Sequence, residues 1–160
     1  MQGSGRFIEA RLAVTRQDLD EVLSHLADDD MRWAPREGMK SVGDLLLEIA
    51  RKDHEIVSYL KNGEWPDDDP DPFDAASATL SEAKAGLIAT RAATLAYLHS
   101  LNPAELDEII TLPERWWESL RLLECPRSEM LRNISAHEWY HTAQLITYLW
   151  SRGDNPEEWG

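Results

Sequence analysis

The sequence predicts an all-α protein, a four-helix bundle with long inter-helix connections. In four stretches of the 160-residue chain the apolar residues recur at three- and four-residue spacings, which is the period of an amphipathic helix. No convincing alternation of period two is present, so no strand is expected. Because this length suits one core and no internal repeat is found, we expect residues 1–160 to form a single domain.

The first two helices are expected over residues 7–26 and 41–60. An acidic triplet at residues 28–30 follows the first helix, and we interpret it as a solvated loop. The second helix begins with a capping box of Ser41 and Asp44, in which aspartate replaces the usual glutamate. Asn62-Gly63 is a stop signal and ends this helix.

A connection rich in proline and aspartate, residues 64–76, separates the second helix from the third. Its three prolines exclude a helix, and its aspartates lack the spacing of a calcium loop. We expect a solvated connection with Trp65 and Phe73 packed against the body. The third helix is expected over residues 79–101, from a capping box to an Asn-Pro pair.

The remaining chain holds an irregular segment and the longest helix. Residues 103–124 show no clear period, and we expect their apolar side chains to cover one end of the core. The fourth helix is expected from Pro126, a residue suited to the first turn, to about Gly153. Four long helices with extended connections predict a bundle.

Charge and cysteine content restrict the partners. Asp and Glu number 30 against 16 Lys and Arg, a formal net charge of −14. This balance argues against nucleic acid and against an anionic membrane surface, since both are bound through Lys and Arg. The single cysteine, Cys125, allows no disulfide within the chain, and we find neither a signal peptide nor an apolar run of about 20 residues. We expect a cytoplasmic protein in which Cys125 is a structural thiol.

The most informative segment is His137-Glu138-Trp139-Tyr140-His141. Residues four apart lie on one face of a helix, one turn from each other, so both imidazoles can reach one metal ion. Both histidines fall on the inward stripe of their helix, which also contains Met130, Ile134, Gln144 and Tyr148. Each buried imidazole without a partner costs about 1–3 kcal/mol, so the pair is either a metal site or a hydrogen-bonded part of the core.

The helix over residues 41–60 offers two acids as a third ligand. Glu48 lies at the edge of its apolar stripe, and Asp53 lies near the centre, where an unpaired acid is unusual. Each acid also has an alternative role that involves no metal ion. Glu48 can pair with Lys52, four residues further on, and Asp53 can accept a hydrogen bond from a core tryptophan or histidine.

The five residues 137–141 also match H-E-x-x-H, the pattern of zinc peptidases, in which Glu138 would be the general base. The context is poor for that chemistry, because no expected strand precedes the helix to hold a peptide. The acids downstream of the pattern lie in a short tail at the chain end. A metallopeptidase is therefore the less favoured interpretation.

Residues 41–50, preceded by 33–38 and followed far downstream by 137–149, resemble the DinB/YfiT-like superfamily. The resemblance spans nearly the whole chain, and the last segment is its most specific part. It implies a metal-binding four-helix bundle, often a homodimer, whose divalent ion is held by three histidines, one from the second helix and two from the fourth. Characterised relatives include thiol-dependent S-transferases and a mycothiol-dependent isomerase, while many members have no known activity.

This sequence departs from the family pattern where the histidine of the second helix falls on Glu48. The resemblance then implies one of two sites. In the first, which we favour, Glu48, His137 and His141 bind a divalent ion (Zn, Ni, Mn or Fe) with open positions for water or substrate. In the second the site is degraded, and Glu48 only hydrogen-bonds a histidine. Asp53 stays open as a ligand or an outer partner.

Two functions are compatible with these features. The first is a metal-dependent enzyme, by family analogy a thiol S-transferase, in which the ion binds a small-molecule thiol as its thiolate. Glu138 or Tyr140 would be the nearby acid or base. The second is a non-catalytic, stress-related binding protein with a degraded or purely structural metal site. The state of the metal site discriminates between them.

Overall fold

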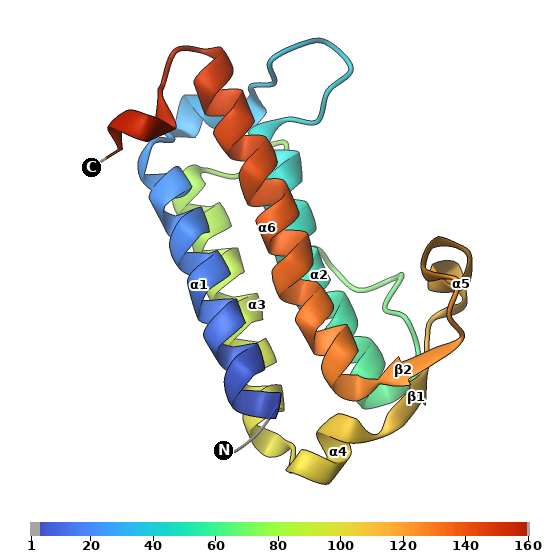
Figure 1. Ribbon diagram of the computed structural model, residues 1–160. Helices are drawn as coiled ribbons and strands as arrows, with labels where there is room; N and C mark the ends of the chain where they lie inside the picture. Colours follow the sequence, from blue (N-terminus) through green and yellow to red (C-terminus); the bar gives the residue numbers. More distant parts are fainter. Residues whose placement is uncertain (1–3, 160) are drawn as a thin grey trace.

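The computed structural model describes residues 4–159, and within them four long helices form the body of the molecule (Figure 1). These helices are α1 (Ser4–Ser24), α2 (Val42–Asn62), α3 (Leu80–Ser100) and α6 (Arg127–Ser151). The strongest pairings are α1 with α6, α2 with α3 and α2 with α6. In Figure 1 the chain rises along α1 and α6 and descends along α2 and α3, so α2 and α6 are antiparallel. The predicted all-α bundle is confirmed.

The capping signals of the sequence mark the starts of both central helices. Ser41 Oγ accepts the backbone N–H of Asp44 at 3.1 Å, and the Asp44 carboxylate accepts the N–H of Ser41 at 2.9 Å. Thr79 and Glu82 make the same reciprocal pair ahead of α3. At the other end of α2, Gly63 has a φ of 76°, the left-handed conformation that ends a helix.

The segment expected to be irregular is more ordered than predicted. It holds α4 (Pro103–Asp107), β1 (Ile109–Thr111), α5 (Glu114–Leu120) and β2 (Glu124–Pro126). The two strands pair antiparallel, with Ile110 opposite Cys125. The expectation of no strand is therefore wrong here, because three residues are too few to show an alternation. Pro126 ends β2 and precedes α6 instead of lying in its first turn.

The connections also differ in detail from the expected loops. The acidic triplet forms most of the short 3-10 helix η1 (Asp28–Arg32), and Asp28 Oδ1 accepts the backbone N–H of Leu80 at 2.7 Å. The triplet therefore helps to cap α3. In the long connection before α3, Phe73 is buried and Trp65 is half-buried, as expected. A second 3-10 helix, η2 (Pro156–Glu158), follows α6.

The core consists of two apolar clusters, one toward each end of the bundle. The first draws on the helix segments 19–23, 42–50, 80–87 and 145–149. The second draws on the segments 8–12, 56–60, 97–98 and 130–134. Between these segments every long helix contributes polar side chains. Asp53, His137, Glu138 and His141 fall in this polar middle layer, and Glu48 lies beside it, within the segment 42–50 of the first cluster.

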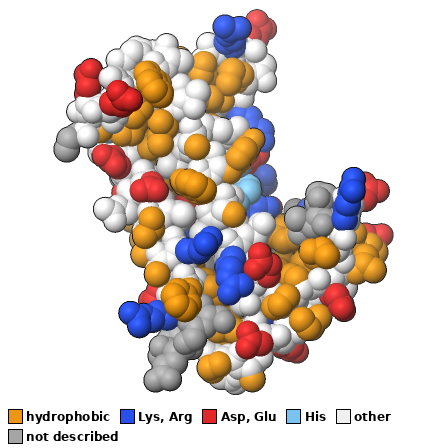
Figure 2. Space-filling view, viewed as in Figure 1, with side chains coloured by type: hydrophobic (Ala, Val, Ile, Leu, Met, Phe, Trp, Pro, Cys, Tyr) orange, Lys and Arg blue, Asp and Glu red, His pale blue; other side chains and the backbone are white. Residues whose placement is uncertain are grey.

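Some large apolar side chains remain on the surface of α1 and α6. More than half of the side-chain surface is exposed for Phe7, Val14, Trp139, Tyr140 and Trp150. Figure 2 shows hydrophobic side chains distributed over the face on which these two helices lie. None of the helices in the described part of the chain combines the length and apolarity needed to cross a membrane.

Candidate metal centre

Glu48, His137 and His141 come together where α2 faces α6. His141 Nε2 lies 3.2 Å from His137 Nε2 and 3.3 Å from Glu48 Oε2. The two imidazole rings meet edge to face, with centroids 4.4 Å apart and an interplanar angle of 70°. Ligand atoms bound to one ion at about 2.0–2.1 Å are themselves separated by roughly 3.0–3.4 Å. The two separations from His141 Nε2 lie within this range.

A hydrogen bond to Gln144 indicates which ring nitrogen of neutral His141 carries the proton. Gln144 Oε1 lies 2.6 Å from His141 Nδ1, and because an amide oxygen only accepts, Nδ1 is the donor. Neutral His141 then turns the lone pair of Nε2 toward the carboxylate of Glu48. Two such electron-rich atoms repel each other unless a proton or a metal ion lies between them.

His137 has an unsatisfied nitrogen. Its Nδ1 is buried and has no hydrogen-bond partner. Among the side chains that the structure describes, only Arg16 Nη2 is also buried without a partner. The pair of imidazoles is thus poorly satisfied as a purely hydrogen-bonded part of the core. Two imidazole nitrogens and one carboxylate oxygen form a donor set suited to Zn²⁺ and to catalytic Fe, Mn or Ni. The residues present fit a divalent ion.

One ion pair competes with this use of Glu48. Its Oε1 is held by the ammonium group of Lys40, while Oε2 points to His141. Across residues 4–159, no group of three or more His, Cys, Asp or Glu side chains already has the arrangement of a complete ligand set.

Burial and nearby charge keep both imidazoles neutral. Burial is the main cause that lowers the pKa of His137 to about 3, and His141, Lys52 and Lys40 add to the effect. Burial also lowers the pKa of His141, against the opposing effects of Gln144 and Glu48. The neutral imidazole is the form that binds a metal ion, so both histidines are ready to bind at neutral pH.

We expect the metal-free protein to lose stability as the pH falls below about 6.5. A histidine whose pKa is lower in the folded state takes up its proton on unfolding, so the free energy of unfolding rises with pH across this window. The change between pH 6.5 and 5.0 should be about 1–2 kcal/mol, because His137 is not fully enclosed. Urea unfolding at the two pH values measures it. His137→Gln should reduce the change, and an unaltered change would contradict this origin.

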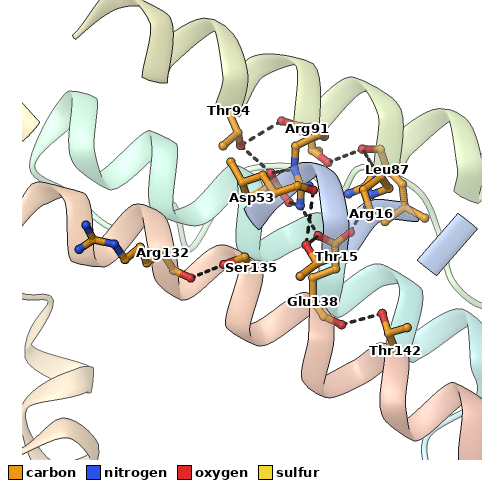
Figure 3. A network of polar contacts seen from close by, with 12 residues as sticks. Thr15, Arg16, Asp53, Leu87, Arg91, Thr94, Arg132, Ser135, Glu138 and Thr142 are labelled. Carbon is orange, nitrogen blue, oxygen red and sulfur yellow. Dashed lines mark hydrogen bonds and ion pairs between the residues drawn. The ribbon is translucent and has the colours of Figure 1, made fainter. Parts of the chain in front are cut away.

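Asp53 does not join the metal centre. It is fully buried. Its carboxylate accepts hydrogen bonds from Arg91 Nε at 2.9 Å, from Arg91 Nη2 at 3.1 Å and from the Thr94 hydroxyl at 2.6 Å (Figure 3). The sequence analysis expects a tryptophan or histidine as the donor, and the structure corrects this. Asp53 turns toward α3, which supplies both partners, and away from the histidines of α6.

Glu138 belongs to the same buried network. Its carboxylate accepts hydrogen bonds from Arg91 Nη2 at 2.5 Å, from Arg16 Nε at 2.6 Å and from the Thr15 hydroxyl at 2.9 Å (Figure 3). The side chain of Glu138 is 1% exposed. Both oxygens are used by side chains from α1 and α3. The carboxylate is therefore unavailable as the general base of a peptidase, and the H-E-x-x-H match lacks the geometry of that chemistry.

The remaining histidines lie in separate ion pairs or ring stacks. His54 contacts Asp69 at 2.8 Å, and His99 contacts Glu9 at 3.0 Å. His25 stacks on Trp159 with ring centroids 4.2 Å apart. None of the three has the i, i+4 spacing that brings His137 and His141 together. For His25 and His99 the lack of a partner at that spacing already predicts that they are not ligands, and for His54 the prediction rests on its position on the other side of α2.

The positions of two basic residues near Glu48 could not be read from the sequence. Lys40 precedes α2, so helical periodicity gives no sign that it reaches Glu48. Lys52 is expected as a partner of Glu48 but instead pairs with Glu55 at 3.1 Å. Its position four residues after Glu48 is nevertheless a signal that it shares the same face of α2.

The sequence profile of the DinB superfamily matches residues 11–145 of this chain. The chain belongs to the DinB superfamily. Among solved structures, this DinB protein is similar to one described as a conserved protein of locus from Enterococcus faecalis, with a TM-score of 0.67 and 18% identity over 92% of this chain and 96% of that chain. At this identity the similarity shows the fold. The comparison with curated proteins finds no match.

Proposed function

We propose that this DinB protein is a metal-dependent enzyme whose divalent ion is bound by Glu48, His137 and His141. The observation that carries the proposal is the position of His141 Nε2, which has His137 Nε2 at 3.2 Å and Glu48 Oε2 at 3.3 Å. A divalent ion bound there would act as a Lewis acid that lowers the pKa of a coordinated thiol or water.

The residues around the ligands have distinct parts in this proposal. Gln144 holds the proton of His141 on Nδ1 and keeps Nε2 available. The ring of Tyr140 lies 5.1 Å from that of His141, and its hydroxyl accepts Gln144 Nε2 at 3.4 Å. Because Tyr140 is largely exposed, its phenol can exchange a proton with a substrate beside the ligands. Glu138, by contrast, has no part in proton transfer.

The reaction class in this proposal is S-transfer from a low-molecular-weight thiol. It is supported by the resemblance to superfamily members that use thiols and by a donor set that leaves positions open for a substrate. The thiolate is the nucleophile at neutral pH. No cysteine of the chain is needed, since Cys125 is buried and burial raises the pKa of its thiol.

We also propose that the protein acts as a homodimer. The resemblance implies this assembly, and the exposed rings of Trp139 and Trp150 on α6 would gain from being covered by a second copy. This part of the proposal is independent of the metal centre, because the exposed rings of Trp139 and Trp150 are not among the ligands.

A second candidate function is a non-catalytic, stress-related binding protein. The ion pair between Lys40 and Glu48 favours it, because that pair stabilises Glu48 without any metal ion. In this case the site is degraded, and the histidines remain only as a strained part of the core.

Metal content distinguishes the two functions. The protein is purified without chelator or affinity tag, and its bound metals are measured by elemental mass spectrometry. The enzyme proposal expects close to one divalent ion for each chain, and S-transfer from a small thiol to an electrophile that depends on this ion. A protein that carries no ion and takes none up on titration would contradict the proposal and leave the binding function.

A further inference from the structure

Lys52 forms a second charged side of the proposed centre. It follows Glu48 by four residues and therefore lies one turn further along the same face of α2. α2 and α6 run antiparallel (Figure 1) and Glu48 contacts His141, so one turn forward along α2, from Glu48 to Lys52, corresponds to one turn back along α6, from His141 to His137. The charges of the two lysines have the effects expected from this arrangement. The charge of Lys52 lowers the pKa of His137 more than that of Lys40 does, whereas the charge of Lys40 has the larger effect on the pKa of His141.

The ammonium group of Lys52 is held in one place by aromatic rings. Its Nζ lies 5.5 Å from the ring centroid of Trp65 and 5.6 Å from that of Trp116, and its side chain is 18% exposed. Trp65 comes from the connection after α2 and Trp116 from α5. Contact with ring faces positions an ammonium group and reduces its hydration, so an incoming anion displaces less water from it.

The balance of charge at this place favours an anion. Lys40 pairs with Glu48 and Lys52 pairs with Glu55, while both histidines are neutral. With a divalent ion bound, the local excess is about two positive charges. The chain as a whole carries a formal charge of −14 and repels anions elsewhere. The centre is thus a local site of attraction for a negatively charged ligand.

We propose that the substrate of this centre is a thiol that carries a carboxylate, and that the carboxylate pairs with the ammonium group of Lys52 beside Trp65 and Trp116. The inference rests on the proposed function and adds to it the substrate class and the residue that selects it. The sulfur faces the three ligands, and the carboxylate extends one helical turn along α2. A neutral thiol of the same size lacks the second contact and binds more weakly.

The test compares two thiols on the Co²⁺-loaded protein. 3-Mercaptopropionate carries a carboxylate, and 2-mercaptoethanol is a neutral thiol of similar size. Each is titrated while the near-ultraviolet charge-transfer band of a thiolate on Co²⁺ is recorded. The wild type is expected to bind 3-mercaptopropionate about tenfold more tightly, the usual worth of a charged hydrogen bond.

Substitutions of lysines on α2 then show which residue causes the preference for the thiol with a carboxylate. Lys52→Gln is expected to reduce the preference to near one, because it weakens the binding of 3-mercaptopropionate much more than that of 2-mercaptoethanol, and Lys52→Arg should keep most of the preference. Lys61→Gln is the matched control, because Lys61 also lies on α2 over an aromatic ring, that of Tyr97, but away from the centre. It should behave as the wild type.

The other outcomes separate this inference from the proposed function. If Lys52→Gln retains the preference, or lowers the affinity for both thiols equally, Lys52 does not select the carboxylate. The inference is then overturned, while the proposed metal centre is unaffected. If the wild type takes up no Co²⁺, or shows no thiolate band with either compound, the proposed thiol chemistry fails and the inference fails with it.

Discussion

The variants His141→Ala and Glu48→Gln are expected to purify without the divalent ion that we propose for the wild type. Removal of one of three ligands should weaken metal binding by more than about 100-fold, since even loss of an outer hydrogen-bond partner of a metal ligand costs 10- to 100-fold. The effect of His137→Ala should be similar. Elemental mass spectrometry of the purified variants, followed by a competition titration with a chelating dye, measures the loss.

Glu48→Gln is the informative variant, because it removes the charge of the side chain but keeps its size. If Glu48 only pairs with Lys40, this variant keeps the metal with wild-type affinity, and the carboxylate ligand is excluded. His54→Ala is the matched control: His54 also lies on α2, but it contacts Asp69 in the long connection. Its removal should leave the metal content unchanged.

Replacement of Arg91 by methionine is expected to destabilise the fold by about 3–5 kcal/mol, the usual cost of removing one partner from a buried ion pair. The side chain of Arg91 is 7% exposed and pairs with Asp53 and Glu138, which are 0% and 1% exposed. Burial opposes the charge of Arg91, but its bonds to these two carboxylates outweigh burial and raise its pKa. Without the guanidinium group, Asp53 keeps only the Thr94 hydroxyl.

Urea unfolding of Arg91→Met and the wild type measures this difference. Arg115→Met is the control, because Arg115 pairs with Asp67 at an exposed position, and such pairs contribute about 0–1 kcal/mol. A loss below about 1 kcal/mol in Arg91→Met would show that the buried charges are solvated or neutralised in another way. Adding Asp53→Asn to Arg91→Met should recover part of the loss, because Asp53 is the carboxylate left without a cationic partner, whereas Glu138 keeps Arg16.

The buried network and the two histidines of the proposed metal centre lie in the same layer of the bundle. Glu138 follows His137 directly in α6 and is held by Arg16 from α1 and Arg91 from α3. These contacts fix the rotation of α6 about its axis. With Glu138 turned toward α1 and α3, His137 and His141 are turned toward Glu48 on α2. We therefore interpret the network as the support that orients the histidines.

The features that depend on local spacing could be predicted from the amino-acid sequence. The helical period gave the four long helices, the boxes at Ser41 and Thr79 gave two of their starts, and the spacing of His137 and His141 placed both imidazoles on one face. The resemblance to the family then pointed to Glu48. These features could be predicted because the atoms involved are separated by at most one turn, or belong to a pattern that recurs in the family.

Only the tertiary structure decided how the charges of the middle layer are paired. Asp53 and Arg91 are 38 residues apart, and Glu138 and Arg16 are 122 apart, so no local spacing connects either pair. The positions of Lys40 and Lys52 around the centre depend equally on how α2 faces α6. The physical reason is that a buried charge takes its partner from whichever helix the packing places opposite it, and packing is a property of the whole bundle.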